Sequence, residues 1–266
     1  MTNHPAGRPL PRILHGSAEP VFGVLPETVL DNLRRPGSEN ALLWNLIYPL
    51  AAPSLSLEAL LAVRPLWGTA GVKPEQDDLA PFFWGYSPDG RRLPGLDAVL
   101  DRIDGPGPRT EIDLFLLGRR NLVVVEAKRA SGLGRCARFD RGRCPHAHPA
   151  LADDQACRYW ADEPARFDTP LAWDGPPAPD ERPACSRHYQ LARTLVVGLA
   201  LASALDRQLN LWLLAPAGGW RRLEPAWLDF ANAVRDANLW RRMRVIAWES
   251  LGQMPAGVGP KSGQHG

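Results

Sequence analysis

The sequence predicts an α/β fold in which helices flank a central mixed β-sheet. Two apolar runs, 109–117 and 122–129, are separated by the turn sequence GRRN, and this pattern predicts an antiparallel hairpin. Helical and strand patterns alternate along the chain, as is typical of α/β sandwiches. A length of 266 residues is sufficient for one domain with a large core.

The expected elements follow in chain order. Helices are expected at 27–35, 38–50 and 56–63, and an irregular aromatic stretch at 79–95. Ser38 suits the N-cap of the second helix, with Glu39 in its first turn. Strands are expected at 96–103, 109–117 and 122–129. The remaining elements are a helix at 186–206, a strand at 209–216, a helix at 225–238 and a strand at 243–251.

The domain organisation is expected to be simple. One domain covers 26–251 and contains an insertion at 130–184, while 1–25 and 252–266 contain Gly, Pro and polar residues and are expected to be flexible. The longest apolar run, 195–205, is too short to span a membrane. The start of the chain lacks the apolar region of a signal peptide. These features predict a cytoplasmic protein without disulfides or membrane contact.

The formal net charge of +2 is too small to indicate a nucleic-acid partner by itself.

Lysines are rare in this chain, and one of them, Lys128, lies at the end of a predicted strand. The chain has 31 lysines and arginines, but the only lysines are Lys73, Lys128 and Lys261. A lysine against such a background suggests a role that arginine fills poorly, because an ammonium is a compact charge whose pKa shifts readily on burial.

Lys128 follows a strand that ends in two opposite charges. Val124, Glu126 and Lys128 share one face of that strand, and Asp113 can approach Glu126 across the hairpin. Two adjacent carboxylates repel each other unless a cation lies between them, and Mg²⁺ is often held by one or two carboxylates with water and phosphate. The alternative is a Glu–Lys ion pair at a solvent-facing strand end.

Asp113, a short hairpin and then Glu126-Ala127-Lys128 resemble the PD-(D/E)XK nuclease superfamily, which has the restriction-endonuclease-like fold. Glu39 on a helix before the sheet and Gln190 on the helix after the lysine strand also fit this pattern, so the resemblance spans roughly 39–216. Two differences from the pattern of the superfamily leave open which of its branches the chain resembles most. Ile112 replaces the leading proline, and Thr194 stands where some branches carry tyrosine.

The resemblance implies a role for each of these residues. Asp113 and Glu126 would bind Mg²⁺ or Mn²⁺, and Lys128 would orient or help deprotonate the attacking water. Glu39 would bind a second metal or hold a water, and Gln190 would position phosphate or water. The implied activity is hydrolysis of nucleic acid, with DNA as the expected substrate, in restriction, repair or defence. A non-cleaving nucleic-acid-binding module on the same scaffold is the alternative. A carboxylate acid/base hydrolase is a weaker one, because it leaves Lys128 without a task.

The insertion begins with an arginine-rich loop. Five arginines stand against one acid, Asp140, over 129–143. They are Arg129, Arg135, Arg138, Arg141 and Arg143. Such a loop could contact the phosphate backbone of nucleic acid. A solvated loop in an arginine-rich protein is the alternative.

All four cysteines also lie in this part of the chain. Cys136, Cys144, Cys157 and Cys185 are separated by seven, twelve and 27 residues, without a C-x-x-C pair. Some branches of the superfamily carry a four-cysteine iron–sulfur cluster, and thiolates suit either Zn²⁺ or a [4Fe–4S] cluster. His146 and His148 could replace a thiol as ligands. Ordinary buried thiols are the alternative.

Overall fold

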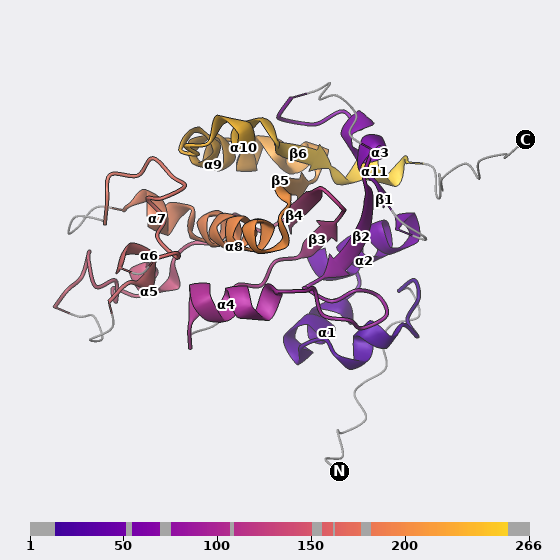
Figure 1. Ribbon diagram of the computed structural model, residues 1–266, viewed down its shortest axis with the longest axis horizontal. Helices are drawn as coiled ribbons and strands as arrows, with labels where there is room; N and C mark the ends of the chain where they lie inside the picture. Colours follow the sequence, from indigo (N-terminus) through magenta and orange to yellow (C-terminus); the bar gives the residue numbers. More distant parts are fainter. Residues whose placement is uncertain are drawn as a thin grey trace, which may run out of the picture.

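The computed structural model describes residues 14–51, 55–69, 76–106, 109–150, 156–161, 163–176 and 182–254. A six-stranded sheet with strands in chain order lies at its centre (Figure 1). The strands are β1 (Leu55–Ser56), β2 (Asp78–Phe83), β3 (Leu114–Leu117), β4 (Asn121–Ala127), β5 (Gln208–Ala215) and β6 (Met243–Ala247). Neighbours from β1 to β4 are antiparallel, and β4, β5 and β6 run parallel. The predicted α/β fold with a mixed sheet is confirmed.

Helices cover both faces of this sheet, because alternate side chains of each strand point to opposite sides. One face packs against α1 (Glu27–Leu33), α2 (Glu39–Leu50), α3 (Leu57–Ala62) and α11 (Trp248–Gly252). The other packs against α4 (Leu96–Asp104), α8 (Tyr189–Leu205), α9 (Trp220–Asn232) and α10 (Ala237–Arg241). Along β4, Val124 joins the core beneath α8, whereas Val123 and Val125 join the opposite core.

The predicted hairpin is formed by β3 and β4, with Leu114 paired to Val125 and Leu117 to Leu122. All seven residues of β4 are buried, as a central strand requires. The first strand of the hairpin is shorter than expected, because residues 109–113 lie outside β3. Asp113 therefore stands directly before the strand rather than within it.

Several sequence predictions were wrong in type. The expected strand at 96–103 is helix α4, whose Leu96, Val99 and Ile103 recur at helical spacing and are buried together. The stretch 79–95, expected to be irregular, contributes most of β2. The last strand stops at Ala247, and the chain continues into α11.

Other differences concern boundaries. The helix expected at 225–238 begins earlier, at Trp220, and ends at Asn232. The helix expected at 186–206 is divided into the short α7 (Ala184–Arg187) and the long α8. The helices expected near the N-terminus are present as α1, α2 and α3. Ser38 caps α2 as predicted, since its side chain accepts a hydrogen bond from the Ala41 N–H.

The described part of the N-terminal segment is packed against the domain, although 1–25 was expected to be flexible. Leu14, Val21 and Leu25 are buried, and the carbonyl of His15 accepts a hydrogen bond of 2.7 Å from the indole of Trp44. Residues 1–13 and most of the expected C-terminal tail lie outside the described residues. Within the described ranges, no helix has the length and apolar character needed to cross a membrane.

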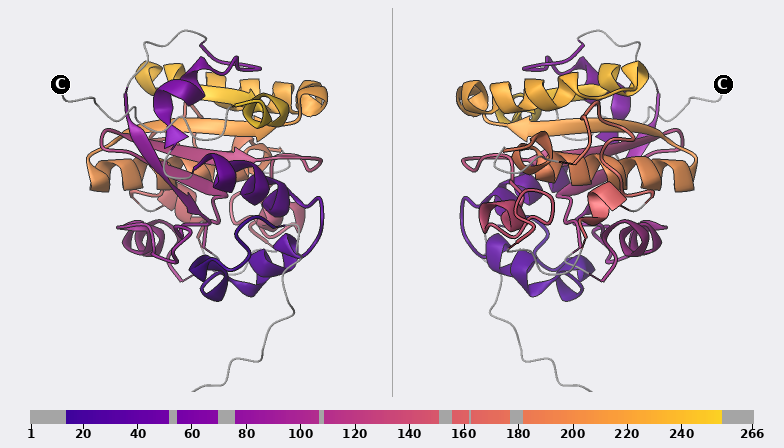
Figure 2. Two further views of the ribbon diagram at one scale, coloured as in Figure 1. Left: turned by 90° about the vertical axis from the view of Figure 1, so that its right-hand side faces the viewer. Right: turned by 90° about the vertical axis from the view of Figure 1, so that its left-hand side faces the viewer.

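The insertion packs at the N-terminal end of α8 (Figures 1 and 2). It contains α5 (Ala137–Asp140) and α6 (Arg158–Ala161), followed by α7 at its end. Tyr159, Trp160 and Phe167 join the core on the α8 side of the sheet. The buried carboxylate of Asp104 accepts hydrogen bonds from Tyr159 and Arg193, both of 3.0 Å, and so ties α6 to α4 and α8.

Candidate active site

Asp113 and Glu126 meet at the end of the β3–β4 hairpin, as the sequence predicted. The strand register places Asp113 opposite Glu126, on the face that packs against α8. The backbone N–H of Ala127 donates to Oδ2 of Asp113 over 2.8 Å, which fixes the aspartate against β4. Glu126 is only 1 % exposed. A carboxylate this deeply buried requires a partner or a bound cation.

Lys128 is part of the same buried group. Its Nζ lies 2.7 Å from Oε1 of Glu126 and 3.8 Å from Oε2 of Glu39. The backbone is held on both sides, because Lys128 donates to the carbonyl of Leu214 and accepts from the indole of Trp248. Lys128 is 7 % exposed, so the alternative of a solvent-facing strand end is wrong.

Gln190 joins the group from the first turn of α8. Its Nε2 donates to Oε1 of Glu126, and its Oε1 accepts from the backbone N–H of Gly134 over 2.8 Å. A second hydrogen bond of 3.1 Å, from the backbone N–H of Gln190 to the carbonyl of Gly134, joins the same two residues. Both ends of the amide are therefore engaged. In this structure Gln190 holds Glu126, and its predicted contact with phosphate or water stays a prediction.

Glu39 approaches from the opposite side of the sheet, in the first turn of α2. Its Oε1 accepts a hydrogen bond of 2.6 Å from the hydroxyl of Ser131, and its Oε2 faces Lys128. Because Ser131 belongs to the loop after β4, this bond joins α2 to that loop. Sequence reasoning missed Ser131, which carries no local signal of its role.

The electrostatics of the group favour added positive charge. Burial and the neighbouring Asp113 raise the pKa of Glu126 well above its usual range. Burial also raises the pKa of Asp113, although Lys128 opposes that change. Burial lowers the pKa of Lys128, but Glu126 and Asp113 outweigh it, so the net shift is upward. The two carboxylates are thus short of positive charge, which a divalent cation would supply.

The Oε2 atom of Glu126 shows whether these side chains are suited to bind a metal ion. Lys128 and Gln190 both contact Oε1 of Glu126, while Oε2 is buried and receives no hydrogen bond among the described residues when both carboxyls are ionised. The Asp113 carboxyl is close enough to share a proton with Glu126, and a cation between the two would replace that proton. A buried carboxylate oxygen without a partner is costly and suits a hard cation. As the side chains stand, no three His, Cys, Asp or Glu residues in the described ranges form a metal-holding group. Two carboxylates are nevertheless enough for Mg²⁺ when water and phosphate complete its shell.

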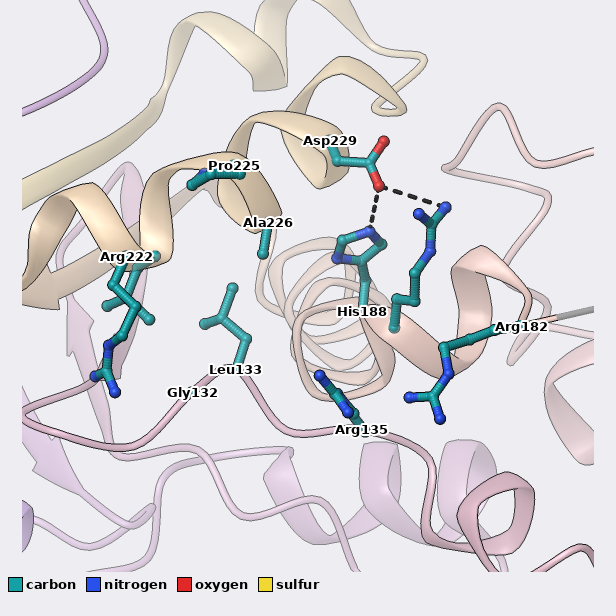
Figure 3. Close-up of a pocket in the computed structure, with 11 residues that line it drawn as sticks. Gly132, Leu133, Arg135, Arg182, His188, Arg222, Pro225, Ala226 and Asp229 are labelled. Atoms are coloured by element: carbon teal, nitrogen blue, oxygen red, sulfur yellow. Dashed lines mark hydrogen bonds and ion pairs between the residues drawn. The ribbon is translucent and has the colours of Figure 1, made fainter.

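A larger pocket of about 840 Å³ lies beside the loop that follows Lys128 (Figure 3). Its ionisable lining residues come from the loop, from α7 and the residues on either side of it, and from α9: Arg135, Arg182, Arg187, His188, Arg222 and Asp229. Nε2 of His188 lies 2.8 Å from Oδ2 of Asp229, and Arg187 also contacts that oxygen. Burial lowers the pKa of His188, although Asp229 opposes the shift. Four arginines against one aspartate make this pocket suited to anions.

The structure separates the five arginines predicted to bind nucleic acid. Arg135 lines the pocket, whereas Arg129 donates to the carbonyl of Gly37. Arg138 is partly buried in α5, and Arg141 and Arg143 are exposed but do not line the pocket. The other pocket arginines were missed, because they are scattered in sequence and only the packing of α7 and α9 brings them together. They are Arg182, Arg187 and Arg222.

The four cysteines, all of them free, converge on one small cavity of about 20 Å³. Phe139, Trp160 and Tyr189 are among the other side chains that line it. The clustering of the cysteines in sequence therefore corresponds to clustering in space. The cavity lies where the insertion meets α7 and the start of α8.

Compared with known proteins, the chain matches no family model, no curated protein and no solved structure. Its function has to be inferred from the side chains of the site.

Proposed function

We propose that the protein is a metal-dependent nuclease of the PD-(D/E)XK type, built on a restriction-endonuclease-like core, which hydrolyses phosphodiester bonds. The observation that carries the proposal is the partnerless Oε2 of Glu126 beside Asp113, with Lys128 on the other oxygen of the same carboxylate. The order of parts also supports it, because the hairpin is followed by α8 with Gln190 and then by the parallel strand β5.

Asp113 and Glu126 would hold Mg²⁺ or Mn²⁺. When bound, the ion would polarise the phosphate and lower the pKa of a bound water. The ammonium of Lys128, fixed beside Glu126, would orient that water and offset negative charge that develops on the phosphate. Gln190 holds Oε1 of Glu126, which would leave Oε2 for the ion. Glu39, held by Ser131, would bind a water on the outer side of Lys128 or a second ion.

The arginine pocket supports a polymeric, anionic substrate. Its wall includes Gly132 and Leu133, which follow Lys128 closely in the chain. A nucleic-acid strand that passes the carboxylates could therefore place neighbouring phosphates against Arg135 and Arg222. Phosphate contacts of this kind supply affinity without sequence preference. We propose DNA as the substrate and the cytoplasm as the place of action.

The test is incubation of the purified chain with plasmid DNA, single-stranded DNA and RNA, with and without Mg²⁺. Cleavage of at least one substrate is expected with Mg²⁺ or Mn²⁺, and none in the presence of a chelator. Asp113→Asn should retain the fold and lose cleavage. Equal cleavage with chelator, or by the Asp113→Asn variant, would rule out the mechanism.

A non-cleaving nucleic-acid-binding module remains a second candidate, because the arginine pocket needs no metal to bind phosphate. The same incubation, followed by gel-shift measurements, separates the two functions. A nuclease cuts with Mg²⁺ and binds without it. A binding module binds equally in both conditions and leaves every substrate intact.

A further inference from the structure

Every cysteine of the protein faces the same cavity. The chain has four cysteines, and Cys136, Cys144, Cys157 and Cys185 all line the cavity of about 20 Å³ between the insertion and α8. They come from separate segments: before α5, after α5, before α6 and within α7. The N–H of Cys136 donates to the carbonyl of Ser186 over 3.1 Å, which holds the first segment against the last. Unrelated buried thiols would have no reason to converge in this way.

The surroundings of these thiols oppose their ionisation when no cation is bound. Burial raises the pKa of Cys157 to about 11 and that of Cys185 to about 12, and the neighbouring cysteines add to both shifts. Without a cation, these two groups are therefore neutral thiols at neutral pH. Since thiolate is the metal-binding form, a bound cation would reverse the preference and release protons.

Donors near these sulfurs act against the effect of burial but do not cancel it. The pKa of Cys136 is raised by burial, but the backbone N–H groups of Phe139 and Arg138 act in the opposite direction. The N–H of Tyr159 lowers the pKa of Cys157, and the indole of Trp160 lowers that of Cys185, again against burial. Donors that hydrogen-bond to ligand atoms are a usual second layer around bound metals.

We propose that the four cysteines form a tetrathiolate metal centre. Thiolate ligands select zinc or an iron–sulfur cluster over hard cations such as Mg²⁺. The cavity has room for a single ion, since a sphere the size of one water needs only about 10 to 15 Å³, and we therefore expect zinc. The described side chains do not yet form a metal-holding group, so the cysteine side chains must rotate toward the centre of the cavity.

The metal centre would stabilise the loop and the helix end that lie next to the candidate active site. Gly134, which holds Gln190, lies two residues before Cys136, and α7 with Cys185 directly precedes α8. A metal that joins these segments would fix the loop and the helix end relative to each other. The centre does not depend on the proposed nuclease activity, so either proposal can fail without the other.

The experiment uses the full chain, purified without oxygen and analysed for metals and acid-labile sulfide. About one zinc ion per chain is expected, with X-ray absorption showing sulfur ligands at about 2.3 Å. Iron with sulfide and a brown colour would support the same four-thiolate centre but identify it as an iron–sulfur cluster. Removing zinc from the wild-type chain should lower its melting temperature, and adding zinc back should restore it. That measurement does not depend on whether any variant folds.

Substitutions identify the ligands. Each single Cys→Ser variant should lose most of its metal and melt at a lower temperature. Ala147→Ser, a small change at a buried position of the same insertion, should keep its metal, and so should His146→Ala. The proposal is overturned if the wild-type chain contains less than about 0.1 equivalents of metal and reloading leaves its melting temperature unchanged. Disulfide links between these cysteines in the isolated protein, or metal loss in His146→Ala, would equally reject a centre of four thiolates.

Discussion

Lys128 and Gln190 contact the same oxygen of Glu126: the ammonium lies 2.7 Å from Oε1, and the side-chain amide donates to that atom as well. Two donors on one oxygen fix the carboxylate and leave the buried Oε2 without a donor. This arrangement explains why a buried strand ends in two opposite charges. The charges stabilise each other, and one buried carboxylate oxygen is left without a donor, which a cation would satisfy.

Replacing Lys128 by arginine tests its role. Arginine keeps the positive charge, but its planar fork is larger than the space beside Glu126, where Lys128 is 7 % exposed. Lys128→Arg and Lys128→Met should both reduce the cleavage rate by about 10²- to 10⁴-fold, the range typical of a group that assists proton transfer. The measurement is plasmid cleavage under saturating Mg²⁺, with circular dichroism to check the fold. Wild-type rates in Lys128→Arg would mean that Lys128 serves only as an ion-pair partner of Glu126.

The contact between Gly134 and Gln190 leads to a second prediction. A Cβ atom at Gly134 would lie 2.8 Å from Oε1 and 3.1 Å from Cβ of Gln190, closer than such atoms pack. Gly134→Val should therefore displace Gln190, release Glu126 and reduce the cleavage rate by about 10²-fold, as small misplacements in active sites do. Gly218→Val is the matched control, because a Cβ added at Gly218 would meet nothing within 4 Å. If both variants cleave equally well, Gln190 does not position Glu126.

Two arginines of the same loop should differ in nucleic-acid binding. Arg135 lines the pocket, whereas the exposed Arg141 does not. In an Asp113→Asn background that cannot cleave, Arg135→Ala should weaken binding and reduce the salt slope by about 0.9 for one lost phosphate contact on duplex DNA. Arg141→Ala should leave both unchanged. Gel-shift titrations over a range of salt concentrations provide the measurement, and equal effects of the two substitutions would contradict a role for the pocket.

The sequence contained enough information to predict the centre of the site. Alternation predicted that Glu126 shares a strand face with Val124, and the hairpin predicted that Asp113 can approach it; the structure turns that face toward α8. These contacts are local or follow from strand register, which periodicity defines. The arginine pocket depends on how α7 and α9 pack, and this packing leaves no periodic signal in the sequence.

Helix α4 shows how a local prediction failed. Its sequence, LDAVLDRID, was expected to form a strand, yet Leu96, Val99 and Ile103 lie on one helical face and are all buried. The helical period was present in the sequence, and the β-branched side chains of Val99 and Ile103 do not outweigh it. For the cysteines, spacing could indicate a cluster, but only the folded insertion brings Cys136 beside the segment that contains Cys185.

Asp77 provides a prediction for stability in acid. Its buried carboxylate accepts the N–H groups of Arg119, Arg120 and Asn121 at 2.8 to 3.0 Å, and so holds the β3–β4 turn. Burial raises the pKa of Asp77, but these hydrogen bonds outweigh it and the net shift is below the ordinary 3.8. The native state binds a proton at Asp77 less readily than the unfolded state does. The stabilisation by the ionised carboxylate is therefore fully present above pH 3.8, and it is lost as the pH falls through the lowered pKa of the native state.

Asp77→Asn should therefore cost about 1 to 3 kcal/mol of unfolding free energy at neutral pH, because the amide presents one acceptor oxygen to several donors. The difference from wild type should shrink on acidification from about pH 5 to about pH 2. Urea unfolding at a series of pH values measures it. Asp78→Asn removes the same charge at an exposed neighbouring position and serves as the control. A difference between wild type and Asp77→Asn that stays constant with pH would show that the ionised carboxylate does not stabilise the turn.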